Sequence, residues 1–194
     1  MTMAFDALSD VSDEALLVLY GNGDPEAARA LSLRFAPLAF RIAVRMLGDR
    51  AEAEDLAQEA LLRLWRIAPE WRAGEAKVST WLYRVVTNLA TDRLRRRRGV
   101  GLDEAPEIED GAASAVERMI EHDRAEALQR ALDLLPARQR QAVVLRHLEG
   151  LSNPEIAAAM EIGVEAVESL TARGKRALAA LLAGRREELG YGHD

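Results

Sequence analysis

Hydrophobic residues recur every three to four positions along most of the chain, the spacing that gathers them on one face of an α-helix. Leu31, Phe35, Leu38 and Ile42 follow this spacing, and it returns between residues 115 and 182. Strand-type alternation with β-branched and aromatic residues is absent, while the helix-favouring residues Ala, Leu, Arg and Glu are abundant. The pattern predicts an all-α fold.

Turn and capping residues mark where these helices begin and end. A short apolar helix is expected to end at residues 21–23, and Asp24 followed by Pro25 is a typical start for the next helix. Pro37 is expected to kink or divide that run, which ends at residues 48–49. Further helices are expected over residues 51–67, 78–98, 115–135 and 137–147.

Residues 99–113 interrupt the helical pattern with three glycines, one proline and five acidic residues. Such a stretch has too little apolar content to pack, so it is expected to be a linker between two helical domains. The expected divisions are an N-terminal acidic extension over 1–24, a first domain over 25–98, a linker over 99–122, a second domain over 123–184 and a tail over 185–194.

The sharpest local pattern lies between residues 152 and 178. Ser152 and Glu155 form a capping box at the start of a short helix, a three-residue turn follows at 161–163, and a longer helix begins at Val164. This order predicts a helix-turn-helix, although an ordinary helical hairpin with a solvated charged face has the same spacing. Outside its apolar positions the longer helix presents Glu165, Glu168, Ser169, Ala172, Arg173, Lys175 and Arg176.

The net charge of −6 conceals a division into blocks of opposite sign. Residues 41–98 sum to +5 and residues 136–186 to +3, whereas residues 99–135 sum to −7. The first basic block ends in a run of arginines, Arg93 and then Arg95 to Arg98, which exceeds what helix capping requires. Local basic blocks therefore keep nucleic-acid binding open despite the acidic total, with the acidic segments screening them.

A cluster of acidic residues and three tryptophans complete the chemistry of the first domain. Glu52, Glu54, Asp55, Gln58 and Glu59 lie on one helix without a nearby His or Lys, which favours a protein-interaction face over acid–base catalysis or a metal site. Trp65 and Trp81 are expected to pack in the core, while Trp71 is equally suited to packing or to stacking on an unpaired base.

Several classes of protein are excluded or made remote by composition. The chain has no cysteine, which excludes disulfides, thiolate metal sites and a cysteine nucleophile, and its three histidines fit no metal-binding motif. The beginning of the chain has no signal-peptide pattern, and no apolar stretch is long enough to span a membrane. We expect a cytoplasmic protein without metal, cofactor or membrane insertion.

Three stretches resemble bacterial sigma factors of the extracytoplasmic-function class. Residues 52–65 (EAEDLAQEALLRLW) are similar to sigma region 2.2, and TWLYR at 80–84 with NLATDRLR at 88–95 is similar to regions 2.3 and 2.4. LPARQR at 135–140 and VLRHLEGLS at 144–152 resemble region 4.1 leading into the region 4.2 helix-turn-helix. The resemblance covers about residues 25–98 and 125–182. It implies two small helical domains joined by a flexible acidic linker in a non-catalytic initiation subunit of RNA polymerase.

The resemblance also implies where each contact lies. The residues implied to bind the β′ clamp of core polymerase are Asp55, Gln58, Glu59, Leu62 and Trp65. Those implied to recognise and melt the −10 element, with a base captured near the loop 69–77, are Lys77, Thr80, Trp81, Arg84, Asn88, Arg95, Arg96, Arg97 and Arg98. Those implied to read the −35 element are Glu165, Glu168, Ser169, Ala172, Arg173, Lys175 and Arg176.

One departure from the family pattern lies in the second helix of the helix-turn-helix. Many members carry Lys or Arg followed by Ser-Arg where this chain has Glu168, Ser169 and Leu170, so two cations are missing. We expect Leu170 to pack and the −35 sequence to differ from the common one.

The implied partners are core RNA polymerase through its β′ clamp and β flap, promoter DNA, and an anti-sigma factor that the sequence does not identify. One alternative is a transcription regulator whose only DNA-binding part is the helix-turn-helix, and another is a helical adaptor without DNA readout. The helices over 55–65 and 81–98 favour the sigma factor. An enzyme is the most remote class, because the sequence contains no triad, phosphate loop or metal cluster.

Overall fold

The computed structural model describes residues 8, 10–72, 74, 77–100 and 115–183, with side chains described for all of these except 98–100 and 115–122. All regular elements in this part of the chain are helical, as the hydrophobic spacing predicts. The N-terminal helices are α2 (Asp13–Gly21), α3 (Pro25–Leu47), α4 (Arg50–Ile67), the short 3-10 helix η1 (Ala68–Glu70) and α5 (Val78–Val100). The C-terminal helices are α6 (Ala115–Asp133), α7 (Ala137–Val143), the π-helical turn η2 (Val144–Leu148), α8 (Asn153–Met160) and α9 (Val164–Ala183).

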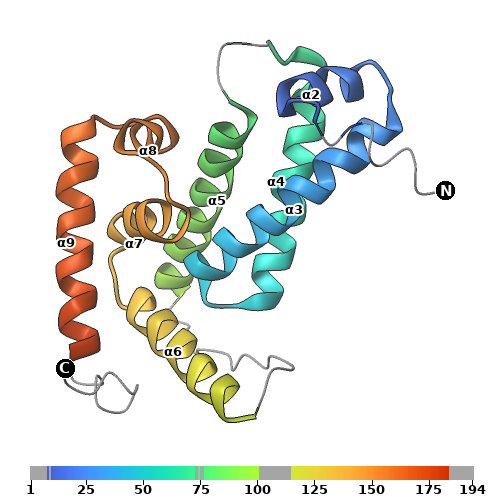
Figure 1. Cartoon of the computed structure of the whole chain (residues 1–194). Coiled ribbons are helices and arrows are strands. Elements are labelled where there is room, and N and C mark those ends of the chain that lie inside the picture. The colour runs from blue at the N-terminus through green and yellow to red at the C-terminus, as the bar shows by residue number, and fades with distance from the viewer. Residues whose placement is uncertain (1–7, 9, 73, 75–76, 101–114, 184–194) are drawn as a thin grey trace.

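Helix α5 lies between the two groups, with α3 and α4 on one side and α7, α8 and α9 on the other (Figure 1). Its Tyr83 packs against both hydrophobic clusters of the protein, one built mainly by α2–α5 and the other by η2, α8 and α9. The larger cluster also takes in Leu132, Leu135, Val143 and Val144 from the C-terminal helices. The two helical groups are thus in direct apolar contact.

The helix ends of the first half follow from the capping residues. The Asp24 carboxylate accepts hydrogen bonds from the backbone N–H groups of Glu26 and Ala27 at the start of α3, where Pro25 needs no partner for its nitrogen. Gly48 ends α3 in the left-handed region with φ 70°, and Asp49 caps α4 by accepting from the N–H of Glu52.

The expected division at Pro37 is wrong, because α3 runs through it as one helix. Pro37 removes the hydrogen bond to the carbonyl of Leu33, but both residues lie on the exposed face of the helix. Water can therefore satisfy that carbonyl, and the apolar face of α3 remains continuous against the core.

Two expected helices lie inside segments named the N-terminal extension and the linker, and one expected helix has a different C-terminal part. Helix α2 lies within the N-terminal extension yet buries Leu16 and Leu17 completely, so this acidic segment contributes to the core. Helix α6 begins at Ala115, inside the stretch 99–122 assigned to the linker, while residues 101–114 lie outside the described part. The helix expected over 137–147 is α-helical only to Val143 and continues as η2.

Helices α7 and α9 cross closely at Gly174. A Cβ atom at this position would lie 2.5 Å from Cγ2 of Val143 and 3.2 Å from the main-chain oxygen of Gln139. Only glycine therefore fits this contact without displacing α7, and the contact fixes α9 against the rest of the C-terminal helices.

Candidate functional site

The helix-turn-helix predicted from the sequence is present in α8 and α9. The capping box is complete, since Glu155 Oε2 accepts from the N–H of Ser152 at 3.0 Å while Ser152 Oγ accepts from the N–H of Glu155. Glu161 forms the turn in the left-handed region with φ 53°, an uncommon conformation for a residue with a side chain. These two features fix the direction in which α9 leaves α8.

The outward face of α9 carries every residue that the sequence predicted for −35 recognition. All are exposed, and they are Glu165, Glu168, Ser169, Ala172, Arg173, Lys175 and Arg176. Arg173 and Arg176 donate from Nε to main-chain oxygens one turn back on the same helix. Leu170 packs against the smaller hydrophobic cluster, as expected, so it does not belong to this face.

Glu168 is tied to α8 rather than isolated on the surface. The Nδ2 group of Asn153 donates to Oε1 of Glu168 at 3.3 Å, which joins the first residue of α8 to the exposed face of α9. A carboxylate at this place can accept a hydrogen bond from a cytosine amino group, whereas it repels phosphate.

The face of α4 predicted to bind a protein carries polar side chains first and apolar ones towards its C-terminal end. Asp55 and Gln58 are exposed, and Leu62 has 53% of its surface exposed, which is high for a leucine. Glu59 accepts hydrogen bonds from Arg63 and Arg93. Trp65 is partly buried, with its ring centroid 4.8 Å from that of Tyr20, so most of it packs inward.

All three tryptophans pack against the larger cluster. The prediction for Trp65 and Trp81 is confirmed. Trp71 also packs here, edge-on to Trp81 with ring centroids 6.4 Å apart. The Trp71 Nε1 atom is buried and forms no hydrogen bond within the described part of the chain.

The structure divides the residues predicted for the −10 element into separate groups. Asn88, Arg95 and Arg96 are exposed. Arg97 instead forms ion pairs with Glu52 and Asp49 and donates to the main-chain oxygen of Leu47, so it joins α5 to α3 and α4. Thr80 and Trp81 are half-buried, and the side chain of Arg98 lies outside the described residues.

Lys77 and Arg84 form the remaining group, and both point to the C-terminal helices. The Nζ atom of Lys77 lies 3.2 Å from Oε1 of Glu155, and Nη1 of Arg84 lies 3.0 Å from Oε1 of Glu161. The acceptors are the capping-box residue and the turn residue of the helix-turn-helix. Two of the residues predicted for the −10 element thus contact the start of α8 and the turn, outside the α9 face predicted for the −35 element.

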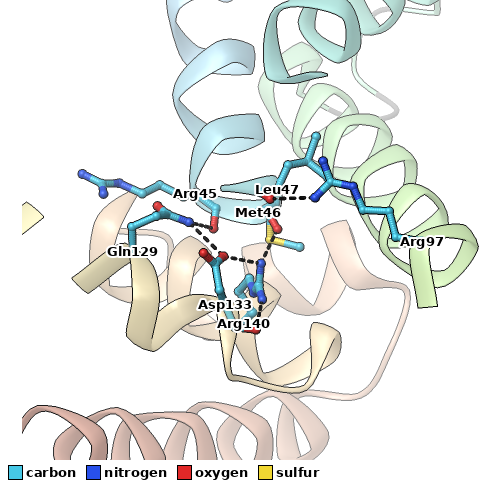
Figure 2. A network of polar contacts seen from close by, with 7 residues as sticks. All are labelled: Arg45, Met46, Leu47, Arg97, Gln129, Asp133 and Arg140. Carbon is cyan, nitrogen blue, oxygen red and sulfur yellow. Dashed lines mark hydrogen bonds and ion pairs between the residues drawn. The ribbon is translucent and has the colours of Figure 1, made fainter. Parts of the chain in front are cut away.

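The contact between the two groups of helices also contains a buried polar network that the sequence did not reveal. Arg140 is 2% exposed, and its guanidinium donates to the main-chain oxygens of Met46 and Asp133, each at 2.5 Å, and to the Asp133 carboxylate at 2.9 Å. Gln129 adds hydrogen bonds to Asp133 and to the carbonyl of Arg45 (Figure 2). The only signal for this network in the sequence is that Arg140 shares a helix face with Val143 and Val144.

Two carboxyl groups of this contact have shifted acidity. Hydrogen bonds from Ser152 and from Lys77 lower the pKa of Glu155 to about 2. Burial raises the pKa of Asp133, while Arg140 opposes the shift.

The described residues contain no group of three metal-ligating side chains, and no helix among them has the length and apolar character needed to cross a membrane.

Comparison with known proteins agrees with this architecture. The chain matches the family description "Sigma-70 region 2" over residues 31–100 and "Sigma-70, region 4" over residues 125–178. It is 32% identical to the RNA polymerase sigma-H factor of Pseudomonas aeruginosa, covering 88% of this chain and 94% of that protein. It is 34% identical to the ECF sigma factor SigM of Mycobacterium tuberculosis (strain H37Rv), covering 93% of this chain and 89% of that protein.

The similarity to another relative is partial. The chain is 38% identical to the ECF sigma factor SigE of Mycolicibacterium smegmatis, but the match covers 76% of this chain and only 58% of that protein.

Solved structures show the same fold. CnrH, in complex with the cytosolic domain of CnrY, is similar with a TM-score of 0.67 and 25% identity, covering 89% of this chain and 97% of that one. The sigma factor RpoE of Bartonella quintana, in complex with the anti-sigma factor NepR, is similar with a TM-score of 0.63 and 24% identity, covering 78% of this chain and 94% of that one. The chain belongs to the sigma-70 family as a factor of the extracytoplasmic-function class, a DNA-binding initiation factor of transcription and not an enzyme.

Proposed function

We propose that the chain binds core RNA polymerase and directs it to a specific set of promoters, acting in the cytoplasm. The observation that carries this proposal is the exposed face of α9, which presents Ser169, Ala172, Arg173 and Arg176 on a capped helix-turn-helix. A second helix in this motif usually lies in the major groove, where such side chains contact base edges and phosphates. This face is the one proposed to read the −35 element.

Region 2 supplies the other proposed contacts. The exposed α4 face, with Asp55, Gln58 and Leu62, is proposed to bind the β′ clamp, since these are the residues that the family resemblance assigns to that contact and the structure leaves them exposed. The cationic side chains of α5, among them Arg95 and Arg96, are proposed to hold the backbone of the −10 element while it melts.

The proposed regulation is an anti-sigma factor. Two structurally similar proteins were solved as complexes. In one, the sigma factor RpoE is in complex with the anti-sigma factor NepR, and in the other, CnrH is in complex with the cytosolic domain of CnrY. The fold they share with this chain supports the same mode of control here, by a partner that the structure does not identify.

Run-off transcription with purified core polymerase tests the function. A pool of host promoter fragments is transcribed with core alone, with core plus the chain, and with core plus a variant carrying Arg173→Ala and Arg176→Ala. We expect specific transcripts only with the native chain, and at least about a tenfold loss in the variant because two DNA contacts are removed. Transcripts that do not depend on the chain, or failure of the chain to co-purify with core, would contradict the proposal.

A further inference from the structure

The exposed face of α9 is divided by charge along the length of the helix. Its first two turns present Glu165 and Glu168. The cations Arg173, Lys175 and Arg176 follow, and two of them donate to main-chain oxygens of α9 and not to these carboxylates. In a helix-turn-helix the N-terminal residues of the second helix contact base edges. The carboxylates therefore occupy the part of α9 that meets the bases.

Glu168 is held in place by a residue of the preceding helix. The Nδ2 atom of Asn153, the first residue of α8, donates to Oε1 of Glu168 at 3.3 Å. Among the described residues of α8 and α9 this is the only side-chain hydrogen bond that joins the two helices. A carboxylate only accepts hydrogen bonds, so the amide must present its NH2 group to it. The contact uses one acceptor site of Glu168 and leaves Oε2 available to a ligand.

The surface next to Glu168 allows a close approach to DNA. Ala172 lies one turn further along the same side of α9 and is exposed, so the neighbouring position carries only a methyl group. Leu170 packs inward against the smaller hydrophobic cluster. No long side chain at these two positions holds the Glu168 carboxylate away from the floor of the major groove.

The bases offer a carboxylate only two hydrogen-bond donors in the major groove, the N4 amino group of cytosine and the N6 amino group of adenine. Guanine presents two acceptors there, and thymine presents one acceptor and a methyl group, so neither can satisfy a carboxylate. Adenine places the acceptor N7 beside its amino group, which suits the donor and acceptor of an amide side chain. Cytosine is therefore the base that matches a carboxylate.

We propose that Glu168 makes the chain selective for a cytosine in the −35 element and that Asn153 is the positioning residue that orients its carboxylate. The proposal rests on the −35 role proposed above for α9. Phosphates repel the carboxylate on every DNA sequence, and the hydrogen bond to cytosine offsets this cost at one base pair. Glu168 therefore acts chiefly by rejecting the other three bases.

Selection from a random library tests the choice of base. Short duplexes with a randomised window are captured through a tag on the full chain with core polymerase present, so recovery does not require the complex to form. The native chain, E168Q and E168R are compared. We expect a single position of the selected sequences to change, from cytosine for the native chain to adenine for E168Q and guanine for E168R, because glutamine matches adenine and arginine matches guanine.

Binding to two defined duplexes measures the discrimination. The duplexes differ only at the selected position, which carries either C·G or G·C. We expect the native chain to bind the C·G duplex at least about tenfold more tightly and E168R to reverse the preference. The matched control is E54Q, which removes one carboxylate on α4, where Glu54 is exposed and pairs with Arg50. It should leave the preference within about twofold of that of the native chain.

The same duplexes test Asn153. N153A is expected to lower the preference at least about threefold and to leave affinity for random duplex unchanged, because the carboxylate loses its orientation and keeps its charge. In an E168A background, adding N153A should not change the preference further. A loss of affinity by N153A that is equal on all duplexes would overturn the positioning role, since a structural defect or a lost phosphate contact acts on every sequence alike.

Three results would overturn the selectivity for cytosine. They are selection of one and the same sequence by the native chain, E168Q and E168R, selection by the native chain of another base at the position that changes, and an effect of E54Q on the preference as large as that of E168Q. Run-off transcription by the native chain does not depend on which base meets residue 168, so the sigma function and this inference fail separately.

Discussion

The guanidinium of Arg140 donates a hydrogen bond to the main-chain oxygen of Met46 at 2.5 Å, joining two residues 94 positions apart in the sequence. Met46 lies in the last turn of α3, where carbonyl oxygens have no partner within the helix. Arg140 therefore completes the end of a region 2 helix from within region 4, while its charge is balanced by Asp133. Figure 2 shows these groups converging between the two regions.

The variant Arg140→Met is expected to lose about 1–3 kcal/mol of unfolding free energy, because it leaves the Met46 carbonyl without its side-chain donor and leaves Asp133 with Gln129 as its remaining side-chain donor among the described residues. Urea unfolding followed by circular dichroism measures the loss. Arg138→Met is the matched control, since Arg138 is exposed on the same helix and should change stability by less than about 0.5 kcal/mol. Equal effects of the two variants would show that the network does not stabilise the fold.

The buried contacts of Arg140 illustrate which structural features can and cannot be predicted from the sequence. Helix ends were predictable where the signal is local, as at Asp24, Ser152 and the glycine at 48, because a cap and its partner are within three residues of each other. Periodicity likewise predicts that Leu170 packs inward. These signals act within one element, so they are present in any short stretch of the chain.

Contacts between distant elements had no such signal. The periodicity of α7 indicates that Arg140 shares a face with Val143, but an arginine at such a position usually extends to solvent. Likewise, Lys77 and Arg84 read as DNA-binding cations, and only the structure shows Glu155 and Glu161 opposite them. The division at Pro37 was predicted wrongly because the sequence does not show that this residue lies on the solvent side of α3.

The close crossing of α7 and α9 predicts that Gly174→Ala is destabilising by about 1–3 kcal/mol, since the added methyl group would overlap Cγ2 of Val143. Thermal unfolding measures the effect. The double variant Gly174→Ala/Val143→Ala should lose less stability than the sum of its single changes, because the second change removes the overlapping atom. At Gly163 a Cβ atom would meet nothing within 4 Å, so Gly163→Ala serves as the control and should be nearly neutral. Strict additivity of the two changes would contradict the crossing.

The lowered pKa of Glu155 predicts that the stability of the fold depends on pH through the start of α8. Hydrogen bonds from Ser152 and Lys77 lower its pKa from 4.5 to about 2 in the folded chain. A carboxyl group with a depressed folded pKa stabilises the fold above its unfolded pKa, and this contribution is lost as the pH falls from about 4.5 toward 2. NMR titration of the Glu155 side-chain carbon should show the low pKa directly. Ser152→Ala should raise it toward 4.5, and an unshifted pKa in the native chain would contradict the capping geometry.

Leu62, the exposed leucine of α4, is a position where a substitution is expected to weaken polymerase binding and leave the fold intact. Leu62 is 53% exposed, so Leu62→Arg is expected to change unfolding free energy by less than about 0.5 kcal/mol. If the α4 face binds core polymerase as proposed, the charge should weaken the complex at least about tenfold, because it places an unpaired charge in an apolar contact. Co-purification and fluorescence anisotropy with core measure this, and Leu33→Arg, at an exposed leucine on α3, is the control. Equal weakening by the two variants would place the contact elsewhere.

The carboxylate of Glu168 is expected to weaken binding of the α9 face to duplex DNA of any sequence. Its carboxylate is exposed, is held by Asn153 at 3.3 Å and repels nearby phosphates. Glu168→Arg should therefore raise affinity for duplex DNA of any sequence and increase the number of released counterions by about one, which steepens the dependence of log K on log salt. Titrations of random duplex at several salt concentrations measure both quantities. Glu54→Arg, a reversal of equal size on α4, separates a local contact from the effect of net charge. A salt slope for Glu168→Arg equal to that of the control would place residue 168 away from the DNA.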